Sequence, residues 1–237
     1  MKIMNEYKVD DDISIKLELD DFTFQPTFTT NLIIQGVIKN ISKDSSILDL
    51  GCGSGVVAIA LSKISKFNHS IYASDISKTV EKIVKNNSKL NLVDIEVRQS
   101  NLFESWNRKF DYIVDDVSGI SSKVADLSPW FKNISCESGV NGDLLTKKVL
   151  KKAPSYLEES GRLFFPVISL SNVPSILNAA KNYFNNVELV VKKDWPLPEA
   201  MLTEKKKLEK LKLNGHIDFQ EKFGLLIAST SIFKAYN

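Results

Sequence analysis

Three glycines alternate with other residues directly after a short apolar run, and an aspartate stands two residues before the first of them. Residues 47–58 read ILDLGCGSGVVA, so Asp49 precedes Gly51, Gly53 and Gly55. Glycine permits positive φ angles and lets a ligand approach the main chain. A helix that follows adds unpaired N–H groups and the positive end of its dipole. The spacing therefore predicts a ligand site on this loop, at the carboxyl end of a parallel strand.

The class of ligand is limited by what the loop lacks. It has no Gly-Lys-Ser/Thr of a phosphate-binding loop, and Val56 stands where a dinucleotide fingerprint needs its third glycine. Asp49 would repel a pyrophosphate but suits a cationic group such as an amino-acid ammonium. Asp75, 20 residues after Gly55, can accept hydrogen bonds from both ribose hydroxyls. S-adenosylmethionine combines a ribose with an ammonium and carries no phosphate, so it is the predicted cofactor.

Apolar strand-length runs and amphipathic stretches alternate along most of the chain, which predicts βαβ units and a mostly parallel sheet. Strands are expected at 13–19, 46–50, 70–74, 95–98, 110–115, 162–168, 186–192 and 225–233. Helices are expected at about 30–40, 56–64, 78–90, 142–157, 173–184 and 199–213, the first capped by Thr29 or Thr30. The last strand follows an insertion, so it is expected to run antiparallel at or near an edge.

These elements predict an α/β, Rossmann-like fold with a mostly parallel seven-stranded sheet and one antiparallel strand. Residues 1–237 are expected to form one domain. Its N-terminal β extension takes up residues 1–29, and its core takes up residues 30–237 with a helical insertion near 199–213.

The segments ILDLGCGSG and YASD resemble motif I and the following acidic motif of class I S-adenosylmethionine-dependent methyltransferases. The resemblance in element order covers roughly residues 30–233. It implies that Asp49 lies near the ammonium, directly or through water, that Asp75 binds the ribose, and that Ile76 packs on the adenine. Asn101 would meet the adenine amino group, although it could also be an ordinary turn residue. The implied cofactor-binding set is Asp49, Gly51, Cys52, Gly53, Asp75, Ile76, Asn101, Leu102 and Asp116.

A narrower resemblance is to the small-domain type of methyltransferase that includes release-factor glutamine N5-methyltransferases. It rests on residues 110–114, 25–30, 137–143 and 160–165. Members carry Asn-Pro-Pro-Tyr just after the fourth core strand, which grips a planar amide. This chain has Asp116-Val-Ser-Gly119 there. An ionised Asp116 accepts hydrogen bonds but cannot donate one to an amide carbonyl. It could instead hold an amine or hydroxyl and take its proton, or it could cap the next helix.

The sequence thus predicts a methyltransferase, with Asp116 as the catalytic residue, that acts on an N or O nucleophile of a small molecule or peptide. Ser118, Trp130 and Trp195 are the expected substrate-binding residues, although the tryptophans could equally serve packing. The alternatives are a protein glutamine N5- or RNA N-methyltransferase, or an inactive subunit that binds cofactor or a partner. Asp115 and Asp116 face opposite ways along a strand, so no metal is expected.

Composition narrows the partners further. The net charge of +2 gives no global basic field, so nucleic acid is possible but not favoured. Lysine clusters at 147–148, 151–152, 192–193 and 205–212 fit solvated helix faces, or an acidic partner. No stretch has the length and apolarity of a membrane helix. Cys52 and Cys136 are the only cysteines, which favours a reducing, cytoplasmic setting.

Overall fold

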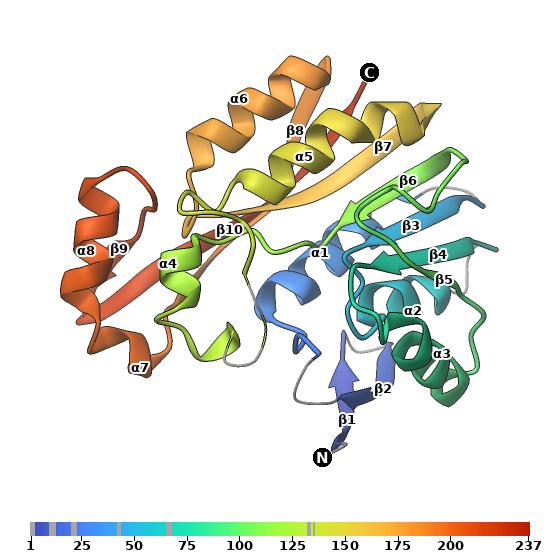
Figure 1. Ribbon diagram of the computed structural model, residues 1–237, viewed down its shortest axis with the longest axis horizontal. Coiled ribbons are helices and arrows are strands. Elements are labelled where there is room, and N and C mark those ends of the chain that lie inside the picture. The colour runs from blue at the N-terminus through green and yellow to red at the C-terminus, as the bar shows by residue number, and fades with distance from the viewer. Residues whose placement is uncertain are drawn as a thin grey trace.

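The computed structural model describes residues 3–9, 13–19, 23–41, 44–64, 68–131, 134 and 136–237. One large sheet crosses the molecule, with helices on both of its faces (Figure 1). Its strands are β3 (Ser46–Leu50), β4 (Ser70–Asp75), β5 (Glu96–Gln99), β6 (Phe110–Asp115), β7 (Leu157–Ile168), β8 (Asn186–Pro196), β9 (Gln220–Lys222) and β10 (Leu225–Tyr236).

The strand order is β5-β4-β3-β6-β7-β10-β8, with the short β9 paired to β10. The pairs from β5 to β7 are all parallel, whereas β10 is antiparallel to β7, β8 and β9. The predicted fold class is confirmed, including the single reversed strand, although the short β9 makes the sheet eight-stranded rather than seven-stranded. From β3 the chain adds β4 and β5 on one side, and it then returns to add β6 on the other side. In open α/β sheets, ligands bind outside the carboxyl ends of the strands at such a switch point.

Alternation along the strands gives the sheet two apolar faces, because successive side chains point to opposite sides. Ile47 and Val114 face one cluster and Leu48 and Phe165 face the other, all with no exposed surface. The first face is covered by α1 (Phe28–Ile38), α2 (Val56–Ser62) and α3 (Val80–Asn91), and the second by α5 (Leu144–Lys152) and α6 (Val173–Tyr183). The core is thus a three-layer α/β/α sandwich.

A third apolar cluster packs against the first half of β10, at the end of the sheet where α4 (Ser122–Ala125) and α8 (Lys205–Leu213) lie in Figure 1. Val124, Met201 and Leu208 are its fully buried helical members. The predicted helix at 199–213 is interrupted, since α7 (Glu199–Leu202) and α8 (Lys205–Leu213) are separate. The other short helices are α4 (Ser122–Ala125) and the 3-10 turns η1 (Pro129–Phe131) and η2 (Ala153–Tyr156).

Several boundaries differ from the sequence prediction. The helix expected at 142–157 ends at Lys152, and β7 begins at Leu157 rather than at residue 162. The register of β7 against β6 shifts between Phe110 and Tyr112, so the polar start of β7 pairs across an irregularity that a hydrophobic pattern does not reveal. The strand expected at 186–192 continues to Pro196, because β10 pairs with it along that whole length.

The N-terminal extension is a two-stranded antiparallel sheet of β1 (Ile3–Lys8) and β2 (Ser14–Leu19), docked on α3. Two asparagines, one helical turn apart on α3, replace a neighbouring strand. The carboxamide of Asn91 accepts from the Lys16 N–H at 2.9 Å and donates to the Lys16 carbonyl at 2.7 Å. Asn87 does the same for Glu18, at 2.7 and 3.2 Å. Side chains thus satisfy backbone groups that an open strand edge would leave unpaired.

Asn87 also links the extension to the glycine loop, since its amide donates to the Ser54 carbonyl at 3.0 Å.

We expect Asn87→Ala to lower the free energy of unfolding by about 3 kcal/mol, because it leaves several buried backbone groups unpaired. Chemical denaturation measures this loss. Asn182→Ala, at an exposed position on α6, is the matched control and should change stability by less than about 0.5 kcal/mol. Equal stability of the two variants would contradict the docking role of Asn87.

Candidate functional site

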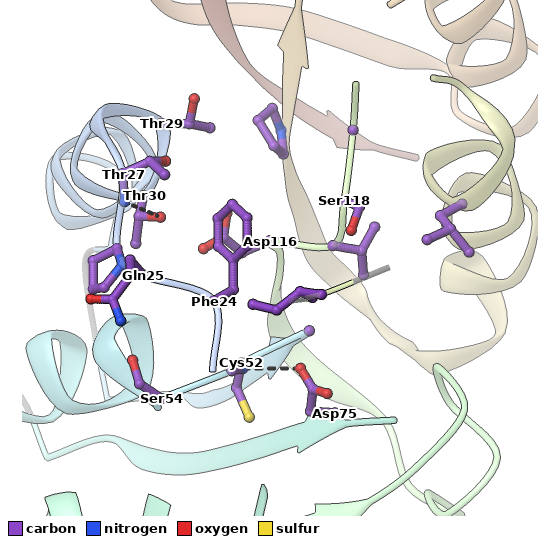
Figure 2. Close-up of a pocket in the computed structure, with 18 of the residues that line it drawn as sticks. Phe24, Gln25, Thr27, Thr29, Thr30, Cys52, Ser54, Asp75, Asp116 and Ser118 are labelled. Carbon is purple, nitrogen blue, oxygen red and sulfur yellow. Dashed lines mark hydrogen bonds between the residues drawn. The ribbon is translucent and has the colours of Figure 1, made fainter. Parts of the chain in front are cut away.

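A cavity of about 670 Å³ opens at the carboxyl ends of β3, β4 and β6, next to the point where strand order reverses. Its volume is that of a site for a ligand the size of a nucleoside cofactor plus part of a second molecule. Figure 2 shows Asp116 between Thr30 of α1 and Ser118, with Cys52 and Asp75 on another side of the same cavity.

The glycine loop forms one wall, and its conformation explains why it is so poor in side chains. Gly51, Gly53 and Gly55 all have positive φ angles, of 83°, 50° and 83°. A Cβ on Gly51 would lie 3.0 Å from the backbone nitrogen of Val117, so the loop there has no room for a side chain. A Cβ on Gly53 would meet nothing within 4 Å, which leaves its backbone open towards the cavity.

Asp75 and its neighbour fix this loop to the end of β4. The N–H groups of Gly51 and Cys52 donate to the Ser74 carbonyl at 2.8 and 3.0 Å. The Gly53 N–H donates to Asp75 Oδ2 at 3.0 Å, and Ser77 N–H donates to Oδ1 at 2.9 Å. Each carboxylate oxygen keeps a further lone pair for a ligand hydroxyl. Asp75 therefore has two tasks, because it shapes the loop and faces the cavity.

Asp49 lies beneath the loop and not on the cavity surface. Its side chain has no exposed area, and the Ala58 N–H donates to Oδ2 at 3.0 Å. Oδ1 is buried and has no partner among the described residues. Burial raises the pKa of Asp49 well above its usual value, and the nearby Asp116 raises it further. Because this side chain does not reach the cavity, a contact with an ammonium through water is the form in which the Asp49 prediction stays open.

Three further cofactor candidates line the cavity beyond Asp75. Ile76 is 64% exposed there, which provides an apolar surface against which a planar base can pack. The Asn101 amide donates to Glu104 Oε1 at 3.0 Å, so its orientation is fixed by a neighbour. Leu102 has a φ of 54°, a left-handed conformation that is unfavourable for leucine and is concentrated at functional sites.

Asp116 stands directly after β6, with its N–H bonded to the Leu50 carbonyl at 2.9 Å. Burial raises its pKa to about 8, the adjacent Asp115 contributes, and a hydrogen bond from the Thr30 side chain opposes the rise. It does not cap the next helix, because α4 begins at Ser122 with Ser121 as its N-cap. Asp116 is therefore a partly buried acid, held at the cavity wall, that titrates near neutral pH.

Asp115, the preceding residue, points away from the cavity and is fully buried. Burial raises its pKa to about 8, while the Val117 N–H donates to its Oδ1 at 3.2 Å. Its Oδ2 has no partner among the described residues. Two adjacent acids with raised pKa values keep this end of β6 largely neutral at pH 7, because ionising both would be costly.

The other side of the cavity holds the predicted substrate residues and some that the sequence did not reveal. Ser118, Trp130 and Trp195 all line it. Trp195 lies in β8 rather than in a loop, and Trp130 lies in η1. The segment before α1 was missed, although residues 25–30 had drawn attention as part of a family resemblance. Its lining residues are Thr23, Phe24, Gln25, Pro26 and Thr27, and the first turn of α1 adds Phe28, Thr29 and Thr30.

Helix α1, which directly follows this segment, begins at Phe28, two residues earlier than predicted. Its N-cap is Thr27, whose N–H donates to Thr30 Oγ1 at 3.3 Å. Thr29 and Thr30 are therefore buried in the first turn instead of capping the helix. Tyr7 of the N-terminal extension lies close by, and its hydroxyl donates to the Thr27 carbonyl at 3.5 Å.

In the described ranges, no group of three or more His, Cys, Asp and Glu side chains gathers in a way that could hold a metal ion. No helix in that part of the chain is both long and apolar enough to cross a membrane.

The cavity lies beside the point where the strand order of the sheet reverses, with a glycine loop on one side and an acid at the end of the next strand. This arrangement is typical of Rossmann-like methyltransferases. Residues 27–116 match the family model of the methyltransferase small domain. The chain is accordingly an S-adenosylmethionine-dependent methyltransferase.

Two curated relatives illustrate the similarity. A protein of Methanocaldococcus jannaschii, provisionally named as a protein N5-glutamine methyltransferase, is 27% identical over 188 residues, covering 79% of this chain and 93% of that protein. The release factor glutamine methyltransferase of Lactococcus lactis subsp. lactis is 26% identical over 162 residues, covering 65% of this chain. This chain spans only 58% of that second relative's length.

Solved structures share the fold. The ribosomal protein L11 methylase of Lactobacillus delbrueckii subsp. bulgaricus aligns with a TM-score of 0.59 and 20% identity, over 95% of this chain and 97% of that one. The 16S rRNA N2 G1207 methyltransferase of T. thermophilus, in complex with AdoMet and guanosine, aligns with a TM-score of 0.65 and 10% identity. The alignment takes in 100% of this chain and 51% of that one.

The cofactor fits the residues present. The open backbone at Gly53, the remaining lone pairs of Asp75 and the exposed Ile76 suit a methionine portion, a ribose and an adenine in turn.

We expect Asp75→Ala to weaken S-adenosylmethionine binding about 10- to 100-fold, because charge-assisted hydrogen bonds are lost and the loop is released. Isothermal titration calorimetry measures this. The control is Asp94→Ala, at an exposed position outside the cavity, and unchanged affinity in Asp75→Ala would refute the assignment.

Raised pKa values also set a pH dependence of stability. The folded state holds the Asp115 proton up to about pH 8, whereas the unfolded chain loses it near 3.8. Stability from this group is therefore present at low pH and is lost as pH rises through that window. Asp115→Asn keeps the acceptor for the Val117 N–H and removes the ionisation. Its gain in melting temperature over the parent should grow from about pH 5 to about pH 8.5. A gain independent of pH would contradict the burial argument.

Proposed function

We propose that this methyltransferase modifies nitrogen, and that its acceptor is an amine of a small molecule or peptide seated on Asp116. The observation that carries the proposal is the position of that carboxyl. It lines the same cavity as Gly53 and Asp75, and its pKa is raised to about 8. A base whose pKa lies near the working pH is effective at removing a proton from a reacting nitrogen.

The chemistry that the residues must perform is limited. S-adenosylmethionine supplies a methyl group on a sulfonium, so the leaving group departs as a neutral thioether. The acceptor amine enters as an ammonium, and Asp116 in its ionised form takes one proton from it. The freed lone pair then takes the methyl, and the nitrogen again carries the positive charge. Asp116 releases its proton to water, and holding the nitrogen in line is the remaining task of the cavity.

A second candidate acceptor is the carboxamide of a protein glutamine. Relatives named for that reaction favour it, and the raised pKa of Asp116 makes it chemically feasible. A neutral carboxyl has one O–H donor, which could bind the amide carbonyl in place of an asparagine amide. The sequence argument against glutamine had two parts, an ionised Asp116 and the loss of the two prolines and the tyrosine that clamp a flat amide. A neutral Asp116 answers only the first part.

The two acceptors predict opposite effects of the same change. For an amine, both Asp116→Ala and Asp116→Asn should lower kcat at least about 100-fold, because neither can take a proton. For a carboxamide, Asp116→Asn should retain most of the activity, because asparagine supplies the donor at every pH. Turnover is followed as S-adenosylhomocysteine released with amine-bearing and glutamine-bearing peptides, and cofactor affinity should stay within about 3-fold of the parent.

The pH profile gives an independent reading. An amine acceptor requires ionised Asp116, so kcat should rise with pH and level off above about pH 8. A carboxamide requires protonated Asp116, so kcat should fall over the same range. Asp126→Asn, at an exposed position on the surface, is the matched control and should show the parent profile. Absence of S-adenosylhomocysteine with every acceptor, despite intact cofactor binding, would favour the inactive-subunit alternative.

A further inference from the structure

Five aromatic side chains, the aromatic wall, line the cavity on the side that holds the predicted substrate residues. Its members are Phe24, Phe28, Trp130, Phe131 and Trp195. They come from the segment before α1, the first residue of α1, η1 and β8, which lie far apart in the sequence. None of them is fully buried, so their rings form part of the accessible surface of the cavity and do not merely fill the core.

The rings are packed into two contacting groups. Trp195 lies between Trp130 and Phe28, with ring centroids 5.8 and 6.4 Å apart. Phe24, from the N-terminal side, meets Phe131 at 5.0 Å. The indole N–H of Trp195 already donates to Thr230 Oγ1 at 2.9 Å, so it is not a free donor for a ligand. What Trp195 offers to an acceptor is ring surface.

The charges at the cavity favour a cationic guest. Among the described residues that line it, the acidic and basic ones are Asp75, Asp116, Glu137 and Lys148. Three of these four carry a carboxyl group, and Asp75 is occupied with the glycine loop. Aromatic faces carry partial negative charge and attract an ammonium within about 6 Å, most strongly where water is excluded. A neutral carboxamide would gain little from such a surface.

We propose that the aromatic wall and Asp116 form a cage for the cationic alkylammonium group of the acceptor. This inference rests on the proposed function, since it takes the side of the cavity next to Asp116 as the acceptor side. It adds the class of substrate, which is an alkylamine that is positively charged when it binds. The wall supplies cation–π contacts, and the carboxyl, in its ionised form, supplies the counter-charge and the base.

The test compares a cation with its neutral copy. Choline and 3,3-dimethyl-1-butanol have the same shape, but only choline is charged, and neither has an amine proton to lose. Each is titrated calorimetrically into the full chain saturated with S-adenosylhomocysteine. Choline should bind at least about 10-fold more tightly than the isostere, as expected for a desolvated cation–π site.

Variants assign the preference to the wall. Trp195→Ala and Trp130→Ala should each lower choline affinity at least about 5-fold and leave the isostere nearly unchanged, whereas Trp195→Phe should keep most of the preference. Phe223→Ala is the control, because that ring is fully exposed and does not line the cavity. Two separate tryptophans guard against misfolding of either single variant.

The outcomes separate this inference from the proposed function. Equal binding of choline and its isostere, or no binding of choline, overturns the cage. If S-adenosylhomocysteine still binds and Asp116→Asn still abolishes amine methylation, the proposed function stands without the cage. If turnover requires glutamine carboxamides, both proposals fail together.

Discussion

The attachment of the glycine loop to the end of β4 is the constraint on which the site depends. Three consecutive backbone N–H groups, from Gly51 to Gly53, donate to the Ser74 carbonyl and to Asp75 Oδ2. They hold the loop in a left-handed conformation that only glycine adopts without strain. This leaves backbone in place of side chains at the cavity wall and sets the start of α2 behind it. The same carboxylate that shapes the loop faces the cavity, so architecture and ligand binding share one residue.

Burial of acids beside that loop sets the chemistry of the acceptor side. The pKa values of Asp49, Asp115 and Asp116 are all raised by burial. For Asp49 and Asp116, a neighbouring carboxylate raises the pKa further. A buried carboxyl group with a raised pKa lowers the stability of the protein once it ionises. Such groups are concentrated at functional sites. Asp115 has no exposed surface, and its negative charge, once it ionises, raises the pKa of Asp116. The result is a carboxyl that can exchange a proton near neutral pH.

Much of the fold and of the cofactor side could be predicted from the sequence. Strands β3 and β6 were predicted with their observed bounds, because a buried parallel strand is a continuous apolar run that ends in polar residues. The extension was predicted only in part. The pairing of Asn87 and Asn91 with the backbone of β2 has no hydrophobic signature, so no pattern in the sequence reveals it. The limits of β7 and β8 were also missed, since they depend on pairing with β6 and β10.

The sequence by itself determined the methyl donor, because the glycine spacing, Asp49 and Asp75 encode local backbone geometry and strand-end chemistry within about thirty residues. It also located the departure from the glutamine-binding motif at Asp116. Only the tertiary structure brought the aromatic wall into the cavity that this carboxyl lines, since its rings come from residues 24–28, 130–131 and 195. The tertiary structure likewise decided the protonation of Asp116. A pKa depends on burial and on neighbouring charges, which the order of residues along the chain does not specify.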